Sequence, residues 1–154
     1  MVIQLLTGGF VSAIATMIHG LATVSAIGDA RAAARRHAAW PRLHLMGVMV
    51  ATVLVLMLAH TVEVVVWSLS YAVVGAAPEG SDLLYFAFVN YTTLGYGDIT
   101  PVKEWRLVGP IAAMNGILMF GWSTAVLFEV LLKTIERLGA IAAPGTAFSA
   151  EDRG

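Results

Sequence analysis

The sequence predicts an all-α membrane protein with three transmembrane helices, and three observations support this fold class. Of the 154 residues, 58% are apolar and only 12% are charged, whereas a soluble domain carries about a quarter charged residues. Three apolar stretches each exceed the roughly 20 residues that a membrane-spanning helix needs. A fourth apolar segment, between the second and third stretches, is too short to span and can enter a membrane only where protein surrounds it.

The first predicted element is an N-terminal transmembrane helix over residues 1–28. This segment contains no Asp, Glu, Lys or Arg, and the small residues Gly8 and Gly9 would let another helix approach closely. His19 lies inside the span, where an ionisable side chain is a functional hypothesis by default. It has two interpretations: a neutral histidine hydrogen-bonded at a helix contact, or a group that binds a proton or a metal.

Residues 29–42 form a predicted basic loop, which contains Arg31, Arg35, Arg36 and Arg42. Short loops rich in arginine face the cytoplasm, although such a patch also suits anionic lipid. Of nine Lys and Arg residues, seven fall in this loop or beyond residue 132. With three spans, this distribution places the N-terminus outside and the C-terminus inside. We expect a multi-pass protein of the cell membrane, of the bacterial inner-membrane type because eukaryotic sorting motifs are absent.

The second predicted helix covers residues 43–74, and its length implies tilt or projection beyond the bilayer. His60 and Glu63 lie one helical turn apart on one face of it. Three interpretations of Glu63 stay open: support of the following loop or a bond to Arg106, sensing of external pH together with His60, or metal binding with the help of His44 or His19. Trp67 and Tyr71 are interpreted as an interfacial aromatic belt.

A turn-rich stretch over residues 75–80 precedes a short predicted helix over residues 81–92, with Ser81 as its N-cap. The loop at 92–98 follows, with glycines at alternate positions, Gly95 and Gly97. Glycine tolerates positive φ, which a chain needs in order to aim consecutive carbonyl oxygens at one axis. Rings of such carbonyls replace the water of a dehydrated cation. The loop therefore predicts a cation pathway.

The loop Thr92-Thr93-Leu94-Gly95-Tyr96-Gly97-Asp98 resembles the selectivity filter of the potassium channel family. The resemblance implies that residues 43–138 are a pore module. Its parts would be an outer helix (43–74), a re-entrant pore helix (81–92), a filter (92–98) and an inner helix (106–137). It also implies a homotetramer, since the filter is built from four such loops. K⁺ would be the transported ion, bound by Thr93, Leu94, Gly95, Tyr96 and Gly97.

The surroundings of the filter depart from the family pattern. Thr92 and Asp98 flank the ion-binding residues, and Tyr85 can donate a hydrogen bond to Asp98. Phe86, however, cannot donate to Tyr96, and Val89 stands where some family members carry a glutamate. We therefore expect Glu63 and His60 to support the filter from the neighbouring span.

The third predicted span contains the candidate gate. In the family, a glycine about as far past the filter as Gly116 acts as a hinge, and close packing is the alternative interpretation of this residue. Ser123 and Thr124 are expected to face the cavity below the filter, and Phe128 or Leu132 to form a constriction that gates by dewetting. Residues 139–154 are small and polar, and are expected to be a disordered cytoplasmic tail.

The sequence thus predicts a potassium-selective channel subunit that conducts passively and is not an enzyme. Its expected partners are membrane lipid, permeating K⁺ and three further copies of itself, and no nucleic acid. Three alternatives stay open. They are a weakly selective monovalent cation channel, a metal-dependent membrane protein that uses the intramembrane His and Glu residues, and a non-conducting structural subunit that joins other channels. No span carries a ladder of arginines, so a voltage sensor is not expected.

Overall fold

A computed structural model describes residues 1–33 and 40–142, with the side chains of residues 137–142 left out. The regular secondary structure of the described residues is helical, and these residues contain no strand. In chain order the elements are α1 (Val2–Ala33), α2 (Pro41–Val74), α3 (Leu83–Tyr91), a 3₁₀ turn η1 (Lys103–Trp105) and α4 (Val108–Ala142).

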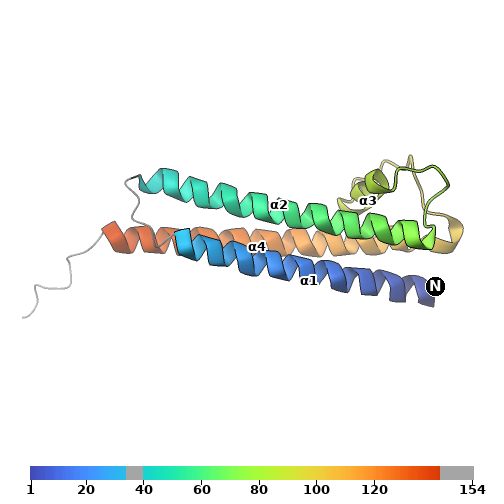
Figure 1. The fold of residues 1–154 in the computed structure, drawn as a ribbon, viewed down its shortest axis with the longest axis horizontal. Helices are drawn as coiled ribbons and strands as arrows, with labels where there is room; N and C mark the ends of the chain where they lie inside the picture. The colour runs from blue at the N-terminus through green and yellow to red at the C-terminus, as the bar shows by residue number, and fades with distance from the viewer. Residues whose placement is uncertain (34–39, 143–154) are drawn as a thin grey trace, which may run out of the picture.

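Three long helices lie side by side, and α2 runs in the direction opposite to α1 and α4 (Figure 1). The short helix α3 lies beside α2 and α4, at the end of the molecule that also carries the N-terminus (Figure 1). Three helical segments are long and apolar enough to cross a membrane, namely Val2–Ala33, Pro41–Val74 and Lys103–Glu136. The prediction of three spans in an all-α protein is therefore confirmed at the level of length and composition.

The ends of the first two long helices differ from the expected boundaries. α1 continues to Ala33, five residues past the expected end of the span, because alanine is the strongest helix former. α2 begins at Pro41, two residues earlier than expected, since proline is well suited to the first helical position. The predicted loop 29–42 is therefore partly helical at both ends, and Arg35 and Arg36 lie outside the described residues.

α3 is shorter than the expected 81–92 because its flanking residues act as caps. The N-cap is Asp82 and not Ser81, since an Asp82 carboxylate oxygen accepts the Tyr85 backbone N–H over 3.0 Å. α4 begins at Val108 and not at 106, because residues 106 and 107 form a turn between η1 and α4. α4 also extends to Ala142, so the first residues of the predicted tail 139–154 are helical. The rest of that tail, 143–154, lies outside the described residues.

The main core holds α3 against α2 and α4. Its largest side chains are aromatic: Trp67, Tyr71, Phe86 and Tyr91. Trp67 and Tyr71 are each only 1% exposed, so the interpretation of these two residues as an interfacial belt is wrong. The Trp67 indole N–H donates to Asn115 Oδ1 over 3.1 Å, which also satisfies the polar atom of a buried ring.

α1 packs along α2 and α4. Near its start, two residues of α1 contact the first turns of α4 and the residue before it. Gln4 Oε1 accepts the backbone N–H of Leu107 over 2.9 Å, and so satisfies one of the free donors at the beginning of α4. Gly8 lies directly against Ile111, where an added Cβ would come within 2.7 Å of Ile111 Cδ1. The first helix is therefore an integral part of the bundle.

Gly116 of α4 is buried against the last turn of α3. A Cβ at this position would collide with the backbone carbonyl of Tyr91, and backbone atoms cannot move aside as a flexible side chain can. The structure thus gives Gly116 the close-packing role. The hinge role stays a prediction.

We predict that Gly116→Ala lowers the free energy of unfolding by about 1–3 kcal/mol, because the added methyl overpacks a backbone contact. The matched control is Gly121→Ala in the same helix, where a Cβ meets nothing within 4 Å. That change should stabilise by up to about 1 kcal/mol, as alanine replaces glycine in a helix. Thermal unfolding in detergent measures both, and equal effects of the two changes would contradict the close contact.

Candidate functional site

The loop at 92–98 begins from a defined termination of α3. Thr92 is the C-cap and Thr93 follows it with a φ of 61°. The Leu94 N–H bonds the Val89 carbonyl over 2.9 Å, and the Thr93 N–H bonds the Asn90 carbonyl over 3.0 Å. This pair of bonds is the Schellman motif, in which the left-handed position is usually glycine.

The loop at 92–98 alternates between positive and negative φ from Thr93 to Gly97. Thr93, Gly95 and Gly97 have positive φ values of 61°, 62° and 78°, and the two residues between them do not. Positive φ at the two glycines agrees with the expectation from the sequence. Positive φ at Thr93 was not predicted, because a β-branched residue in this region is an outlier. Such outliers persist where the surrounding structure over-determines them, and they cluster at functional sites.

All seven residues of the loop are exposed on the single chain. The large side chains of Leu94 and Tyr96 are 52% and 68% exposed. The outer end of the loop is tied to α3, where the Tyr85 hydroxyl donates to Asp98 Oδ2 over 2.7 Å. This bond to Asp98 raises the pKa of the Tyr85 phenol, so the phenol stays a neutral donor near pH 7.

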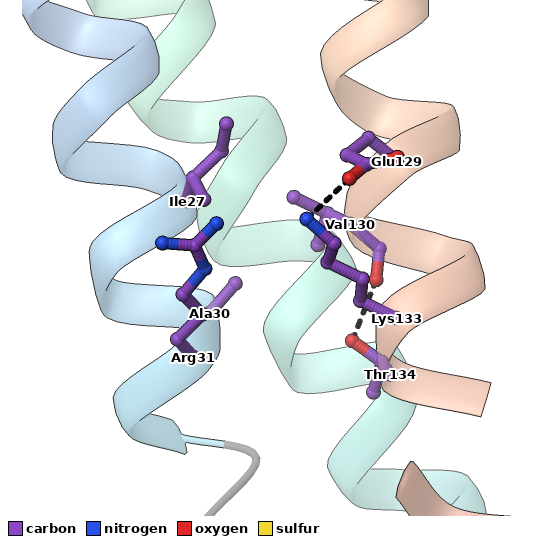
Figure 2. Close-up of a pocket in the computed structure, with 7 residues that line it drawn as sticks. All are labelled: Ile27, Ala30, Arg31, Glu129, Val130, Lys133 and Thr134. Atoms are coloured by element: carbon purple, nitrogen blue, oxygen red, sulfur yellow. Dashed lines mark hydrogen bonds and ion pairs between the residues drawn. The ribbon is translucent and has the colours of Figure 1, made fainter. Parts of the chain in front are cut away.

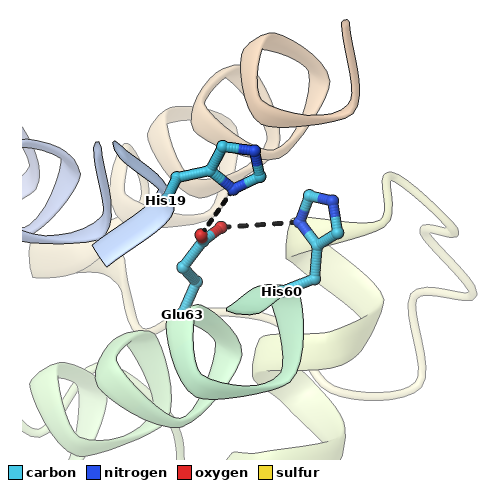
Figure 3. Close-up of side chains that lie close together, drawn as sticks. All are labelled: His19, His60 and Glu63. Carbon is cyan, nitrogen blue, oxygen red and sulfur yellow. Dashed lines mark hydrogen bonds and ion pairs between the residues drawn. The ribbon is translucent and has the colours of Figure 1, made fainter. Parts of the chain in front are cut away.

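Behind the last turn of α3, a buried polar cluster joins all four helices. His19 Nδ1 lies 2.8 Å from Glu63 Oε1, and the Tyr91 hydroxyl donates to Glu63 Oε2. His60 Nδ1 lies 3.1 Å from the same hydroxyl and 3.5 Å from Glu63 Oε2. Ser123 Oγ of α4 lies 2.9 Å from His60 Nε2 and 3.2 Å from His19 Nε2. Figure 3 shows both imidazole rings beside the Glu63 carboxylate.

The contacts of this cluster bear on the interpretations of Glu63 that the sequence left open. Glu63 contacts the end of α3 through Tyr91, as the support interpretation expects, and among the described residues Arg106 is not its partner. His19, and not His44, completes the group, since His44 Nε2 is buried elsewhere without a hydrogen-bond partner among the described residues.

Two members of the cluster were not predicted from the sequence. Tyr91 lies within the predicted helix 81–92, where no neighbouring residue indicates a partner in the second span. Ser123 was expected to face a cavity, but it is 8% exposed and contacts both histidines. The only available signal was the presence of several polar residues within apolar spans.

The candidate gate residues lie on the surface of the single chain, apart from Gly116. Thr124 is exposed, and its hydroxyl donates to the Phe120 carbonyl within α4. Phe128 and Leu132 are 62% and 40% exposed.

Two apolar helices that flank a short helix and a loop of alternating φ form the arrangement of a membrane channel's pore module. A family profile described as "Ion channel" matches residues 55–133, half of the 154-residue chain. The chain belongs to this ion channel family, whose two-helix pore module is found in potassium channels. The match runs from α2 through α3 and the loop into α4, and α1 lies outside it. Comparisons with curated proteins and with solved structures gave no match.

We predict that Thr93→Gly raises the free energy of unfolding by about 1 kcal/mol, because glycine removes the cost of a left-handed residue. The control is Thr92→Gly, where φ is −82° and the hydroxyl bonds the Phe88 carbonyl, so the same change should destabilise. Thermal unfolding of both variants tests this. A loss of stability in Thr93→Gly as large as that in the control would contradict the strain at Thr93.

Proposed function

We propose that the chain is a subunit of a potassium-selective channel that conducts K⁺ passively. The observation that carries the proposal is the alternation of φ at Thr93, Gly95 and Gly97 within the sequence TTLGYGD. When residues alternate between positive and negative φ, successive backbone carbonyls point toward the same side of the chain. Carbonyls arranged in this way can replace the hydration shell of an ion. The carbonyl oxygens of residues 93–97 would bind the ion, with the Thr93 hydroxyl at the inner end of the row.

The exposure of the filter loop supports a homotetramer. One chain supplies one quarter of a carbonyl ring, and four copies around an axis complete it. Leu94 and Tyr96 are large apolar side chains that a single chain leaves more than half exposed. Neighbouring copies would cover them, which also explains why the loop has so few partners within its own chain.

The proposed conduction path continues along α4 below the filter. Thr124, Phe128 and Leu132 would line it, since all three are exposed on the single chain. A constriction at Phe128 or Leu132 closes a narrow pore by excluding water. Passive flow through this path involves no enzymatic step.

The distribution of charge supports an orientation with the N-terminus and the filter outside. Both lie at one end of the bundle (Figure 1). At the opposite end, Figure 2 shows a crevice between α1 and α4 that is lined by Arg31, Lys133 and Glu129, among others. Lys133 pairs with Glu129 one turn away, and the basic residues of this end would face the cytoplasm. We place the protein in a cell membrane, of the bacterial inner-membrane type.

A weakly selective monovalent cation channel is a second candidate, and a specific observation favours it. Phe86 is buried against Tyr71, with ring centroids 5.1 Å apart, and offers no donor to Tyr96. In the outer half of the loop, the side-chain bond to α3 that the described residues make is the one from Tyr85 to Asp98. A filter held more loosely at this end would discriminate less between ions of different size. Reversal potentials in mixed K⁺ and Na⁺ solutions distinguish the two candidates.

Gly97→Ala should abolish potassium selectivity, because an alanine side chain strains a residue with a φ of 78° inside the filter. The control is Gly80→Ala, which has the same φ but lies in the loop before α3. Planar bilayer recordings of the purified protein would measure the K⁺ to Na⁺ permeability ratio. If Gly97→Ala keeps the wild-type ratio, the filter assignment fails.

The purified protein should also run as four chains per particle. Native mass spectrometry in detergent would give this number directly, because a 16.3 kDa subunit makes a tetramer distinct from a dimer or trimer. A monomer that still conducts potassium would refute the shared filter.

A further inference from the structure

The buried cluster behind α3 has the composition of a metal site. We propose that His19, His60 and Glu63 bind a divalent transition metal ion, with Zn²⁺ as the best fit and the Tyr91 hydroxyl at the fourth position. The three side chains each offer one ligand atom, and these atoms all lie within 4.8 Å of one another. They come from two helices, α1 and α2, and Tyr91 adds a third.

The donor set matches a known type of zinc coordination. Two imidazoles and one glutamate are the protein ligands of several zinc sites, in which a fourth position stays open to another oxygen. Imidazole nitrogen also selects for this class of ion over Mg²⁺ and Ca²⁺, which prefer oxygen ligands. The chemistry therefore points to zinc, with cobalt as its spectroscopic substitute.

The distances within the cluster suit a tetrahedral ion. Ligands at about 2.1 Å from a tetrahedral centre lie about 3.4 Å from one another. In the structure, His19 Nδ1 lies 2.8 Å from Glu63 Oε1, and His60 Nδ1 lies 3.5 Å from Glu63 Oε2 and 3.1 Å from the Tyr91 hydroxyl. The ligand atoms of His19, His60 and Glu63 lie within 4.8 Å of one another, so the donors would move together by up to about 1.4 Å to surround a common centre.

Ser123 provides the outer partner that metal-bound histidines need. When both Nδ1 atoms bind a metal, both Nε2 atoms carry hydrogen, and each donates to an oxygen that holds the ring in place. Ser123 Oγ lies within 3.2 Å of both Nε2 atoms and has two lone pairs with which to accept them. Without the ion, two neutral rings that both donate from Nδ1 to Glu63 have lone pairs on both Nε2 atoms. Both lone pairs face the Ser123 hydroxyl, which has one hydrogen and can satisfy only one of them.

A single extra proton on either histidine would satisfy the same atoms, so the experiment has to separate a metal ion from a proton. In that alternative one imidazolium donates to both Glu63 and Ser123, and the other ring accepts from Ser123. Both arrangements leave every member of the cluster hydrogen-bonded or coordinated. The two arrangements differ in whether the cluster contains a metal ion or an extra proton.

The surroundings of the cluster would shelter a bound ion and leave it one access route. His19 and Glu63 are fully buried, and the His60 side chain is 16% exposed. The rings of Phe120 and Trp122 lie against the two histidines, with centroid distances of 4.7 Å and 5.6 Å. Water is thus largely excluded, and the ion would reach the site past His60.

A bound ion would fix the part of the fold from which the filter starts. Tyr91 is the last residue of α3, and Thr93 follows two positions later. Coordination would join the end of α3 to α1 and α2 through bonds stronger than the present hydrogen bonds. Any effect on conduction rests on the proposed function, whereas metal binding itself does not.

The test uses the full chain, purified in detergent without an affinity tag and stripped with a chelator. Titration with Co²⁺ should give the visible absorption bands of a tetrahedral site at one ion per chain, and Zn²⁺ should displace them. His19→Gln should abolish the bands. His44→Gln is the matched control, because His44 lies on α2 outside the cluster, and it should leave them unchanged.

Ser123→Ala keeps all the ligands and therefore tests the site even if His19→Gln fails to fold. It should weaken cobalt affinity by about 10–100-fold, as loss of an outer partner does. An absence of cobalt bands in the wild-type protein would overturn the proposal and leave a proton-filled hydrogen-bond network. Bands that survive in His19→Gln would also overturn it. Neither result bears on whether the protein conducts potassium.

Discussion

The position of the proposed filter, residues 92–98, depends on the last residue of α3, Tyr91, which is held from two sides. Its hydroxyl donates to the buried carboxylate of Glu63, and its carbonyl lies against Gly116 of α4. Both contacts are buried away from water. An unpaired polar group in such a buried place costs several kcal/mol. The end of α3 therefore has one stable place between α2 and α4, and the backbone bonds that terminate the helix fix the direction in which the filter loop leaves.

The loop itself is held much less tightly by its own chain. Three of its residues adopt the left-handed region, including a threonine for which that region is costly. Its side chains are exposed, and its outer end is tied to α3 by the Tyr85–Asp98 bond. A strained and exposed segment on a well-packed support is understandable if contacts outside this chain complete it. The ion channel family to which the chain belongs provides the context for that interpretation.

The first helix lies outside the matched pore module, yet it contacts that module at three positions along its length. Gln4 caps the start of α4, Gly8 admits Ile111, and His19 reaches the carboxylate that also holds the end of α3. The extra helix is thus packed against the matched module at the start of α4 and at the buried cluster behind α3.

The sequence by itself determined the features that depend on local composition and short spacing. These were the three spans, the short helix between the second and third, and the left-handed glycines of the loop. The pairing of Tyr85 with Asp98 was expected from the resemblance of the loop to a potassium channel filter. Only the tertiary structure brought His19 to Glu63, turned Ser123 toward the histidines and placed Gly116 against a carbonyl. The physical reason is that a helix turns by about 100° per residue, so a small rotation decides which side chain faces a neighbour. That rotation is set by packing between segments far apart in the chain, which no local pattern records.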